Sequence, residues 1–267
     1  GVCGNLQNEY SFCYSTFAAM QIRINGQLLL LMLTEKLVNI DCNIIQANTD
    51  GLFIKLKRNQ YDAVHKICKD WENLTGLVLE EDRYEAMYQY AVNDYIAVQE
   101  GYKETKDKKL IKEKGMFITE VKLGKGMSAK IIPEAIQRYL VDKIPVQETV
   151  YNCTDINKFI TYQKADKKFK VEYNNCEIQR INRFYASKLA PCLLKYKIEN
   201  GIKMYTNLLT QSGVVIVNKL DLTVPIKDRK INYGYYLTEI ERTAIGDYRV
   251  ENDFSIQELI NYKNKEN

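Results

Sequence analysis

The stretch IIQANTDGLFIKL (44–56) places one carboxylate, Asp50, in a short polar break between two apolar runs. Asp-Gly between alternating apolar segments is a strong signal for a β-hairpin. The plain interpretation of this pattern is a turn. The alternative is a carboxylate held for chemistry, because a tight hairpin is a rigid support and hard cations such as Mg²⁺ bind carboxylate oxygens.

Other residue types give little catalytic chemistry. The seven cysteines are scattered without a CxxC pair, and His65 is the single histidine. This spacing favours neither a zinc site nor a disulfide framework, so we expect reduced, mostly buried thiols in a cytoplasmic compartment. A histidine-based triad or a multi-histidine metal site is hard to build from one histidine.

Charge is distributed unevenly along the 267 residues. Residues 1–100 carry a net charge of −5, residues 101–150 of +4, residues 151–200 of +5, and residues 201–267 of 0. An acidic first part followed by a basic middle suits a protein that holds cations in one place and a polyanion in the next. A chance distribution of surface charge is the alternative.

The longest apolar run, LLLLML (28–33), is far shorter than the roughly 18 residues that a membrane span requires. No secretory signal is visible, so we expect no membrane association. The chain begins with GVCGN, without Met. Either an initiating segment was removed or the chain is a piece of something longer.

Periodicity predicts a first half built from a long helix over 12–40, a hairpin with strands near 43–47 and 51–56, a second helix over 59–76, and two or three strands within 77–100. In the long helix the apolar residues recur at spacings of three and four residues: Phe17, Met20, Ile24, Leu28 and Leu31. We expect this stripe to face the core and Gly26 to permit close approach by another element. The order favours an α+β fold with helices on one face of an antiparallel sheet.

The second half begins after the polar segment 102–115, which we interpret as a linker or a phosphate-facing loop. Helices are predicted at 133–144, 154–163 and 178–196, a short β unit at 203–224, and a closing helix at 232–247. Pro133 and Thr154 serve as start signals for the first two of these helices. A domain boundary near 125–130 fits this pattern.

The order of several short motifs resembles the C-terminal half of a family B DNA polymerase of the bacteriophage type. The matching stretches are GVCG (1–4), INGQLLLLMLTEKL (24–37), ANTDG (47–51), VNDYIAV (92–98), KEKGMF (112–117) and INYGYYLTEIE (231–241). The resemblance implies a palm over 1–128, with residues 1–10 ending the fingers–palm junction and the hairpin 44–56 carrying motif C, and a thumb over 129–267. The implied fold is α+β, an antiparallel palm sheet with packed helices followed by a mostly helical thumb.

The resemblance also implies the site. Asp50 matches the catalytic, metal-binding aspartate, and Asn48, Thr49 and Gly51 support it. Nucleotidyl transfer in this family uses two Mg²⁺ ions, so the second ion would be shared with an aspartate that lies before residue 1. Asn48 stands where the family has its first acid, and Cys3 stands where it has Tyr.

Contacts with primer–template DNA are implied for Tyr95 and for Asn93, which replaces the family's lysine. Tyr95 could instead fill a core. A track of basic residues would face the phosphates: Lys112, Lys114, Lys122, Lys125, Lys130, Arg180 and Arg183. The implied partners are primer–template DNA, deoxynucleoside triphosphates and the missing N-terminal polymerase segment, in the host cytoplasm if the source is viral.

Three functions remain open from the sequence. The first is a palm–thumb portion that catalyses DNA synthesis once it is completed by the missing segment. The second is a non-catalytic DNA-binding remnant or split-polymerase subunit that grips duplex DNA, which Asn48 and Asn93 favour. The third is a reverse-transcriptase-like palm. It ranks last because its hairpin would carry two adjacent acids, and Asn48-Thr49-Asp50 does not offer that pair.

Overall fold

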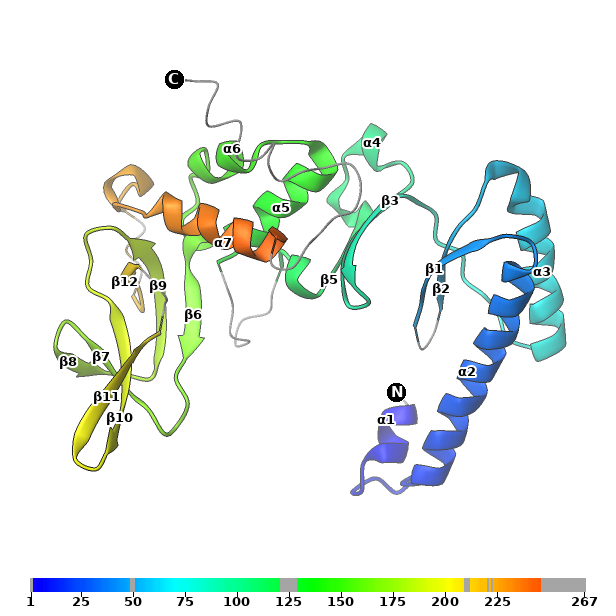
Figure 1. Ribbon diagram of the computed structural model, residues 1–267, viewed down its shortest axis with the longest axis horizontal. Coiled ribbons are helices and arrows are strands. Elements are labelled where there is room, and N and C mark those ends of the chain that lie inside the picture. Colours follow the sequence, from blue (N-terminus) through cyan, green and yellow to red (C-terminus); the bar gives the residue numbers. More distant parts are fainter. Residues whose placement is uncertain are drawn as a thin grey trace. The chain divides into compact units, whose positions relative to one another are not determined.

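The computed structural model describes residues 2–48, 51–120, 129–208, 212–219, 221 and 223–245. The chain divides into two compact units, residues 1–83 and residues 84–267, and each is described by itself (Figure 1). All pairings between the described strands are antiparallel. The α+β class with antiparallel sheets is therefore confirmed. The division by packing differs from the boundary at 128/129 that the resemblance implies, and that boundary stays a prediction.

The first unit holds the elements α1 (Val2–Gln7), α2 (Thr16–Val38), β1 (Asn43–Ala47), β2 (Leu52–Lys55) and α3 (Tyr61–Thr75). The Ser15 side chain caps α2 by accepting a hydrogen bond from the Ala18 N–H at 3.2 Å. Gly76 ends α3 with a φ of 71°, a left-handed conformation that glycine adopts without strain. Both predicted helices and the predicted hairpin are confirmed.

The core of this unit forms where the C-terminal half of α2 meets α3 and the hairpin. Leu33 and Leu37 from α2 pack with Val64 and Trp71 from α3. The Trp71 indole N–H donates to the Leu29 carbonyl at 2.9 Å, so the one tryptophan is both buried and satisfied.

The stripe of α2 that we expected to face the core is exposed. Phe17 is 73% exposed, Met20 63% and Leu28 58%, and the buried residues of α2 are Ala19, Leu33 and Leu37. A Cβ added at Gly26 would meet nothing within 4 Å, so no described element approaches it. The expectation of an inward stripe was wrong for this chain: α1 meets the start of α2, and α3 and the hairpin meet its last turns, but these contacts leave Phe17, Met20 and Leu28 exposed.

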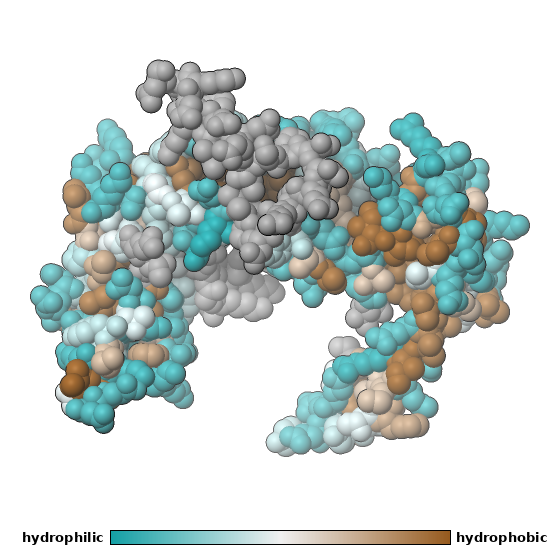
Figure 2. Space-filling model, viewed as in Figure 1, coloured by the Kyte–Doolittle hydropathy of each residue, from teal (hydrophilic) through white to brown (hydrophobic). Residues whose placement is uncertain are grey.

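Figure 2 shows hydrophobic surface running along α2. By length and composition α2 is the one described helix able to cross a membrane, and this is weak evidence, because the core helix of a soluble protein or a signal sequence passes the same test. The prediction of no membrane association stays a prediction.

The second unit begins with a three-stranded sheet of β3 (Tyr84–Ala91), β4 (Asp94–Gln99) and β5 (Ile111–Lys114), in that order. The short helix α4 (Tyr102–Thr105) lies in the connection between β4 and β5. The strands predicted within 77–100 are confirmed from residue 84 onward. The pairing of β4 with β5 also brings the stretches VNDYIAV and KEKGMF side by side.

The rest of the unit holds helices α5 (Ile131–Asp142), α6 (Val146–Tyr151) and α7 (Tyr233–Ile245) and strands β6 (Thr161–Lys164), β7 (Lys170–Tyr173), β8 (Cys176–Ile178), β9 (Ile181–Ser187), β10 (Leu193–Glu199), β11 (Ile202–Asn207) and β12 (Gly213–Ile216). The strands form two sheets, ordered β12-β9-β6 and β11-β10-β7-β8. The first and last predicted helices of this half are confirmed as α5 and α7, and the β unit predicted over 203–224 contains β11 and β12.

Two predicted helices were wrong. The segment 154–163 forms only a 3-10 turn, Ile156–Phe159, before β6, and Asp155 rather than Thr154 caps it. The segment 178–196 forms β9 and the start of β10. The physical reason is that β9 lies between two neighbours and is buried on both faces from Phe184 onward. Such a strand lacks the alternating pattern that distinguishes strand from helix.

The core of this unit gathers α5, α6 and α7 against the strands (Figure 1). Tyr236 from α7 is fully buried, donates its hydroxyl to the Phe159 carbonyl at 2.7 Å and accepts from the Ala186 N–H at 2.9 Å. One side chain thereby ties the closing helix to the 3-10 turn and to the central strand β9.

Candidate functional site

The hairpin that carries Asp50 is closed by two hydrogen bonds between its flanking residues. The Asn48 N–H donates to the Gly51 carbonyl at 3.0 Å, and the Gly51 N–H donates to the Asn48 side-chain oxygen at 2.9 Å. Asn48 is exposed, as expected for a residue at the end of β1. Thr49 and Asp50 lie outside the described residues, so their predicted roles stay predictions.

The described residues of the hairpin do not by themselves hold a magnesium ion. Among the described ranges no group of three or more His, Cys, Asp or Glu side chains could hold a metal. Asn48 offers a neutral oxygen that already accepts from Gly51, and Gln46 is buried. A Mg²⁺ site here would need Asp50 and further carboxylates from elsewhere.

The sheet β3–β4–β5 sorts its residues onto two faces. Ile96, Val98 and Ile111 belong to one face, which packs into the large core. The cross-strand partners Tyr95 and Lys114, and likewise Ala97 and Lys112, share the opposite face. Two predicted DNA-contacting lysines and the predicted tyrosine therefore lie on one face of one sheet.

Lys112 and Lys114 are both exposed. Lys112 donates to the Tyr84 hydroxyl at 3.3 Å, and its ammonium lies 5.9 Å from the centre of the Tyr84 ring. This contact is a weak attraction, worth about 0.5–1 kcal/mol at an exposed site, that holds the ammonium over the sheet surface.

Tyr95 is only 3% exposed. A buried ring fits the alternative that we gave for this residue, a core position, and direct contact with a primer strand would require the ring to be uncovered. Asn93 is exposed in the turn between β3 and β4. Its predicted contact with DNA stays a prediction.

That turn is fixed by the 3-10 turn Gly115–Phe117, which directly follows β5. The Met116 N–H donates to the Asp94 carboxylate at 2.9 Å. Gly115 has a φ of 63°, and a Cβ there would collide with the Asp94 carboxylate and the Asn93 carbonyl. The glycine of KEKGMF is therefore required by the turn of VNDYIAV.

The other predicted basic residues are dispersed. Lys122 and Lys125 lie outside the described residues. Lys130 is half-buried and immediately precedes α5. Arg180 and Arg183 are exposed and lie just before and within β9. The expectation that helices carry these arginines was wrong, because the segment forms β9, whose burial between two neighbouring strands hides the alternating pattern of a strand.

Arg183 lines a hollow of about 210 Å³ together with Tyr162, Gln179, Ile181 and Asn218. Its backbone N–H donates to the Asn218 side chain at 2.8 Å. Tyr162 is the cross-strand partner of Arg183. An exposed cation beside an aromatic ring is an arrangement that can meet both a phosphate and a base. Sequence reasoning singled out Arg183 but missed Tyr162, because it assigned both segments to helices.

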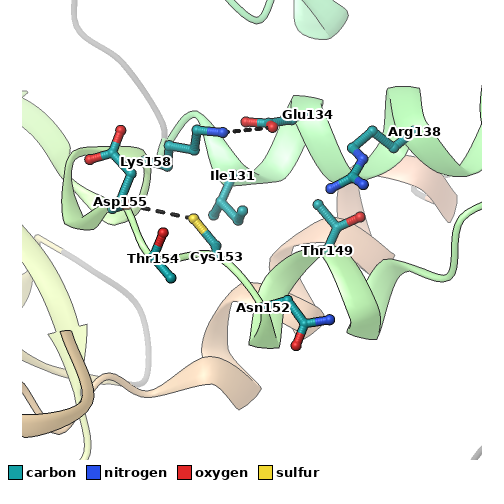
Figure 3. A pocket seen from close by; sticks show the side chains of 9 residues that line it. All are labelled: Ile131, Glu134, Arg138, Thr149, Asn152, Cys153, Thr154, Asp155 and Lys158. Carbon is teal, nitrogen blue, oxygen red and sulfur yellow. Dashed lines mark hydrogen bonds and ion pairs between the residues drawn. The ribbon is translucent and has the colours of Figure 1, made fainter.

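A second hollow, of about 190 Å³, lies between α5, α6 and the 3-10 turn (Figure 3). It is lined largely by polar side chains, among them Arg138 from α5 and Thr149 and Asn152 from the end of α6. Burial raises the pKa of the Cys153 thiol in its wall, so that thiol adds no negative charge near neutral pH. Sequence reasoning missed this hollow, because helix periodicity gives no sign of which polar residues converge.

No protein-family model matches the chain, and no curated protein matches it either.

Proposed function

We propose that the chain is the palm–thumb portion of a family B DNA polymerase, which adds deoxynucleoside triphosphates to a primer 3′ end once a further polymerase segment completes its active site. The observation that carries this proposal is the β1–β2 hairpin, in which Asn48 and Gly51 are hydrogen-bonded on either side of the loop containing Asp50. Such a closed hairpin supports the idea of a carboxylate held at a fixed place, as in-line nucleotidyl transfer requires.

The residues of this chain have distinct roles in the proposal. Asp50 supplies a carboxylate, Asn48 fixes the loop, and Thr49 and Gly51 allow a tight turn beside the primer terminus. When bound, two Mg²⁺ ions supply charge neutralisation and activation of the primer hydroxyl. One carboxylate is too few to hold them, so the second aspartate belongs to the completing segment.

The DNA would lie along the exposed basic side chains. Lys112 and Lys114 share one sheet face, and Arg183 lies beside Tyr162 in a hollow. Phosphate contacts of this kind position a duplex without reading its sequence. This supports binding of primer–template DNA irrespective of sequence.

The exposed stripe of α2 supports the existence of the completing segment. Its apolar side chains leave a surface of the kind that another polypeptide covers. The matched test compares Leu28→Ser with Leu37→Ser, since Leu28 is 58% exposed and Leu37 only 1%. We expect Leu28→Ser to fold normally and to lose association with the completing segment, whereas Leu37→Ser should destabilise the unit itself. Unchanged association in Leu28→Ser would remove this surface from the proposal.

Primer extension tests the proposed activity. The chain is assayed with primer–template DNA, deoxynucleoside triphosphates and Mg²⁺, alone and together with the polypeptide encoded immediately upstream. We expect extension only with both polypeptides, and its loss in Asp50→Asn. Extension by the chain alone would overturn the split site, and no extension by the pair would overturn the polymerase assignment.

The second candidate is a non-catalytic subunit that grips duplex DNA. It is favoured by Asn48, whose side-chain oxygen is engaged by Gly51 and carries no charge. The exposed basic side chains do not depend on Asp50, so this candidate predicts DNA binding that Asp50→Asn leaves unchanged and no synthesis under any pairing.

A further inference from the structure

The hollow between α5 and α6 contains a buried hydroxyl for which the described part of the chain offers no hydrogen-bond partner. Thr149 is 3% exposed, and its Oγ1 is one of two buried side-chain polar atoms without a partner among the described residues. An unpaired buried hydroxyl is costly, so we expect it to have a partner, and a group bound in the hollow would supply one.

A guanidinium lies beside this hydroxyl. Figure 3 shows the Arg138 guanidinium and the Thr149 hydroxyl directed toward the same part of the hollow, with the Asn152 carboxamide below them. Among the described residues no ion pair or side-chain hydrogen bond is found for Arg138. Glu134, four residues earlier on α5, would be its ordinary helix partner, but its carboxylate contacts the Lys158 ammonium at 2.7 Å instead.

The acidic groups of the hollow are engaged elsewhere. Glu134 is neutralised by Lys158, and the Asp155 carboxylate accepts from the Asn157 N–H and from its side-chain amide, each at 2.9 Å. In Figure 3 Asp155 and Lys158 lie on one side of the hollow and the Arg138–Thr149–Asn152 group on the other. The second side therefore presents a cation and two groups able to donate hydrogen bonds.

We propose that Arg138, Thr149 and Asn152 form a binding site for a phosphate oxyanion. A guanidinium fork suits two phosphate oxygens, and the Thr149 hydroxyl and Asn152 amide can donate to the others. At about 190 Å³ the hollow is smaller than the roughly 300–1,000 Å³ of pockets that take whole small molecules. It therefore suits one phosphate group, either free or within a nucleic acid strand, and the proposal does not depend on polymerase activity.

Thermal unfolding of the full chain in sodium phosphate, compared with sodium chloride at equal ionic strength, tests the site. We expect phosphate to raise Tm for the wild type, because a ligand that binds the folded state stabilises it. Arg138→Gln should weaken phosphate binding by roughly ten- to a hundredfold, the value of a lost charge-assisted hydrogen-bond pair. Lys167→Gln, which removes an exposed lysine outside the hollow, is the matched charge control and should respond as the wild type does.

Substitution of Thr149 gives a readout that does not depend on Arg138. Thr149→Val keeps the shape of the side chain and removes the unpaired hydroxyl, so it should raise Tm in chloride. The further rise in Tm that phosphate causes should be smaller than in the wild type. Thr149→Ser keeps the hydroxyl and should retain the increment. A wild type without a phosphate increment, or an increment equal in Arg138→Gln and in the wild type, would overturn the site.

Binding of a short DNA duplex distinguishes the two sources of the phosphate. If the site takes a backbone phosphate, Arg138→Gln should reduce the slope of log K against log salt by about one. If Arg138→Gln leaves this slope unchanged but loses the rise in Tm that inorganic phosphate causes, the site takes free phosphate. Failure of the phosphate increment leaves the proposed polymerase function untouched, since that is tested by primer extension.

Discussion

The side-chain oxygen of Asn48 accepts a hydrogen bond from the Gly51 N–H at 2.9 Å and so closes the hairpin around Asp50. Asn48→Ala should lower the free energy of unfolding by about 0.5–1.5 kcal/mol, because the Gly51 N–H loses its acceptor. Asn48→Asp keeps an acceptor and should stay within about 0.5 kcal/mol of the wild type. Urea denaturation measures both. Equal losses in the two variants would mean that the hydrogen bond does not stabilise the turn.

Gly115 should tolerate no side chain. Gly115→Ala combines a positive φ, which costs a non-glycine residue about 1–2 kcal/mol, with a collision against the turn at Asn93 and Asp94. Gly201→Ala is the matched control, since its φ is 78° and a Cβ there meets nothing within 4 Å. We expect a clearly lower Tm for Gly115→Ala than for Gly201→Ala. Similar values would show that the turn moves aside freely.

Tyr236→Phe should be among the most damaging single-atom deletions in the second unit. It leaves the Ala186 N–H and the Phe159 carbonyl without their partner in a fully buried place, at a cost of about 1–3 kcal/mol per unsatisfied group. The neighbouring change Tyr235→Phe removes a hydroxyl for which no hydrogen bond is found among the described residues. Chemical denaturation of the two variants should show a larger loss for Tyr236→Phe, and the reverse order would contradict the packing described here.

Alkaline pH should destabilise the second unit through Tyr102. Burial and the hydrogen bond to the Asp142 carboxylate raise the pKa of Tyr102 from 10.0 to about 12. Between these values the unfolded chain has lost the phenol proton while the folded chain keeps it. Stability is therefore full below pH 10 and falls as the pH rises toward 12.

The variant Tyr102→Phe isolates this effect. Its free energy of unfolding should decline less steeply over the same pH window, with a proton linkage smaller by about one proton. Equilibrium denaturation at several pH values gives the linkage. An unchanged slope would assign the alkaline sensitivity to other tyrosines, whose pKa values burial also raises at Tyr235 and Tyr236.

Exchange of Lys112 and Lys114 for glutamine should weaken binding of duplex DNA without regard to sequence. If each lysine meets one phosphate, the double variant should reduce the slope of log K against log salt by about two. Fluorescence anisotropy over a salt series measures it. The matched control is Lys66→Gln with Lys167→Gln, two exposed lysines outside the proposed track. Equal slopes in both double variants would place the DNA elsewhere.

Local signals were enough to predict α2, the hairpin and α3, although α1 was missed and α2 begins at Thr16 and not at residue 12. Ser15 and Gly76 provide the caps of α2 and α3, and Asp50-Gly51 lies between strands of the expected length. Which side of α2 is covered could not be predicted in the same way. Periodicity identifies an apolar stripe, but whether something packs on it depends on partners that the helix sequence does not contain.

The strand-rich part of the second unit had signals that we did not use. Asn174 and Asn175 both have positive φ between β7 and β8, and Asn200-Gly201 repeats this between β10 and β11. Paired positive φ values of this kind are typical of two-residue hairpin turns. The proposed site in the α5–α6 hollow had no such signal. Arg138 lacks its ordinary helix partner because Glu134 pairs with Lys158, which is remote from it in the sequence.

The exposed stripe of α2 has a consequence for the fate of the chain in the cell. A newly made chain that has not bound the proposed completing polypeptide exposes a hydrophobic surface, and chaperones and proteases act on such surfaces. If a further polypeptide covers α2, as we propose, copies of the chain made without it should be short-lived or insoluble, and the level of the protein should follow the supply of that polypeptide.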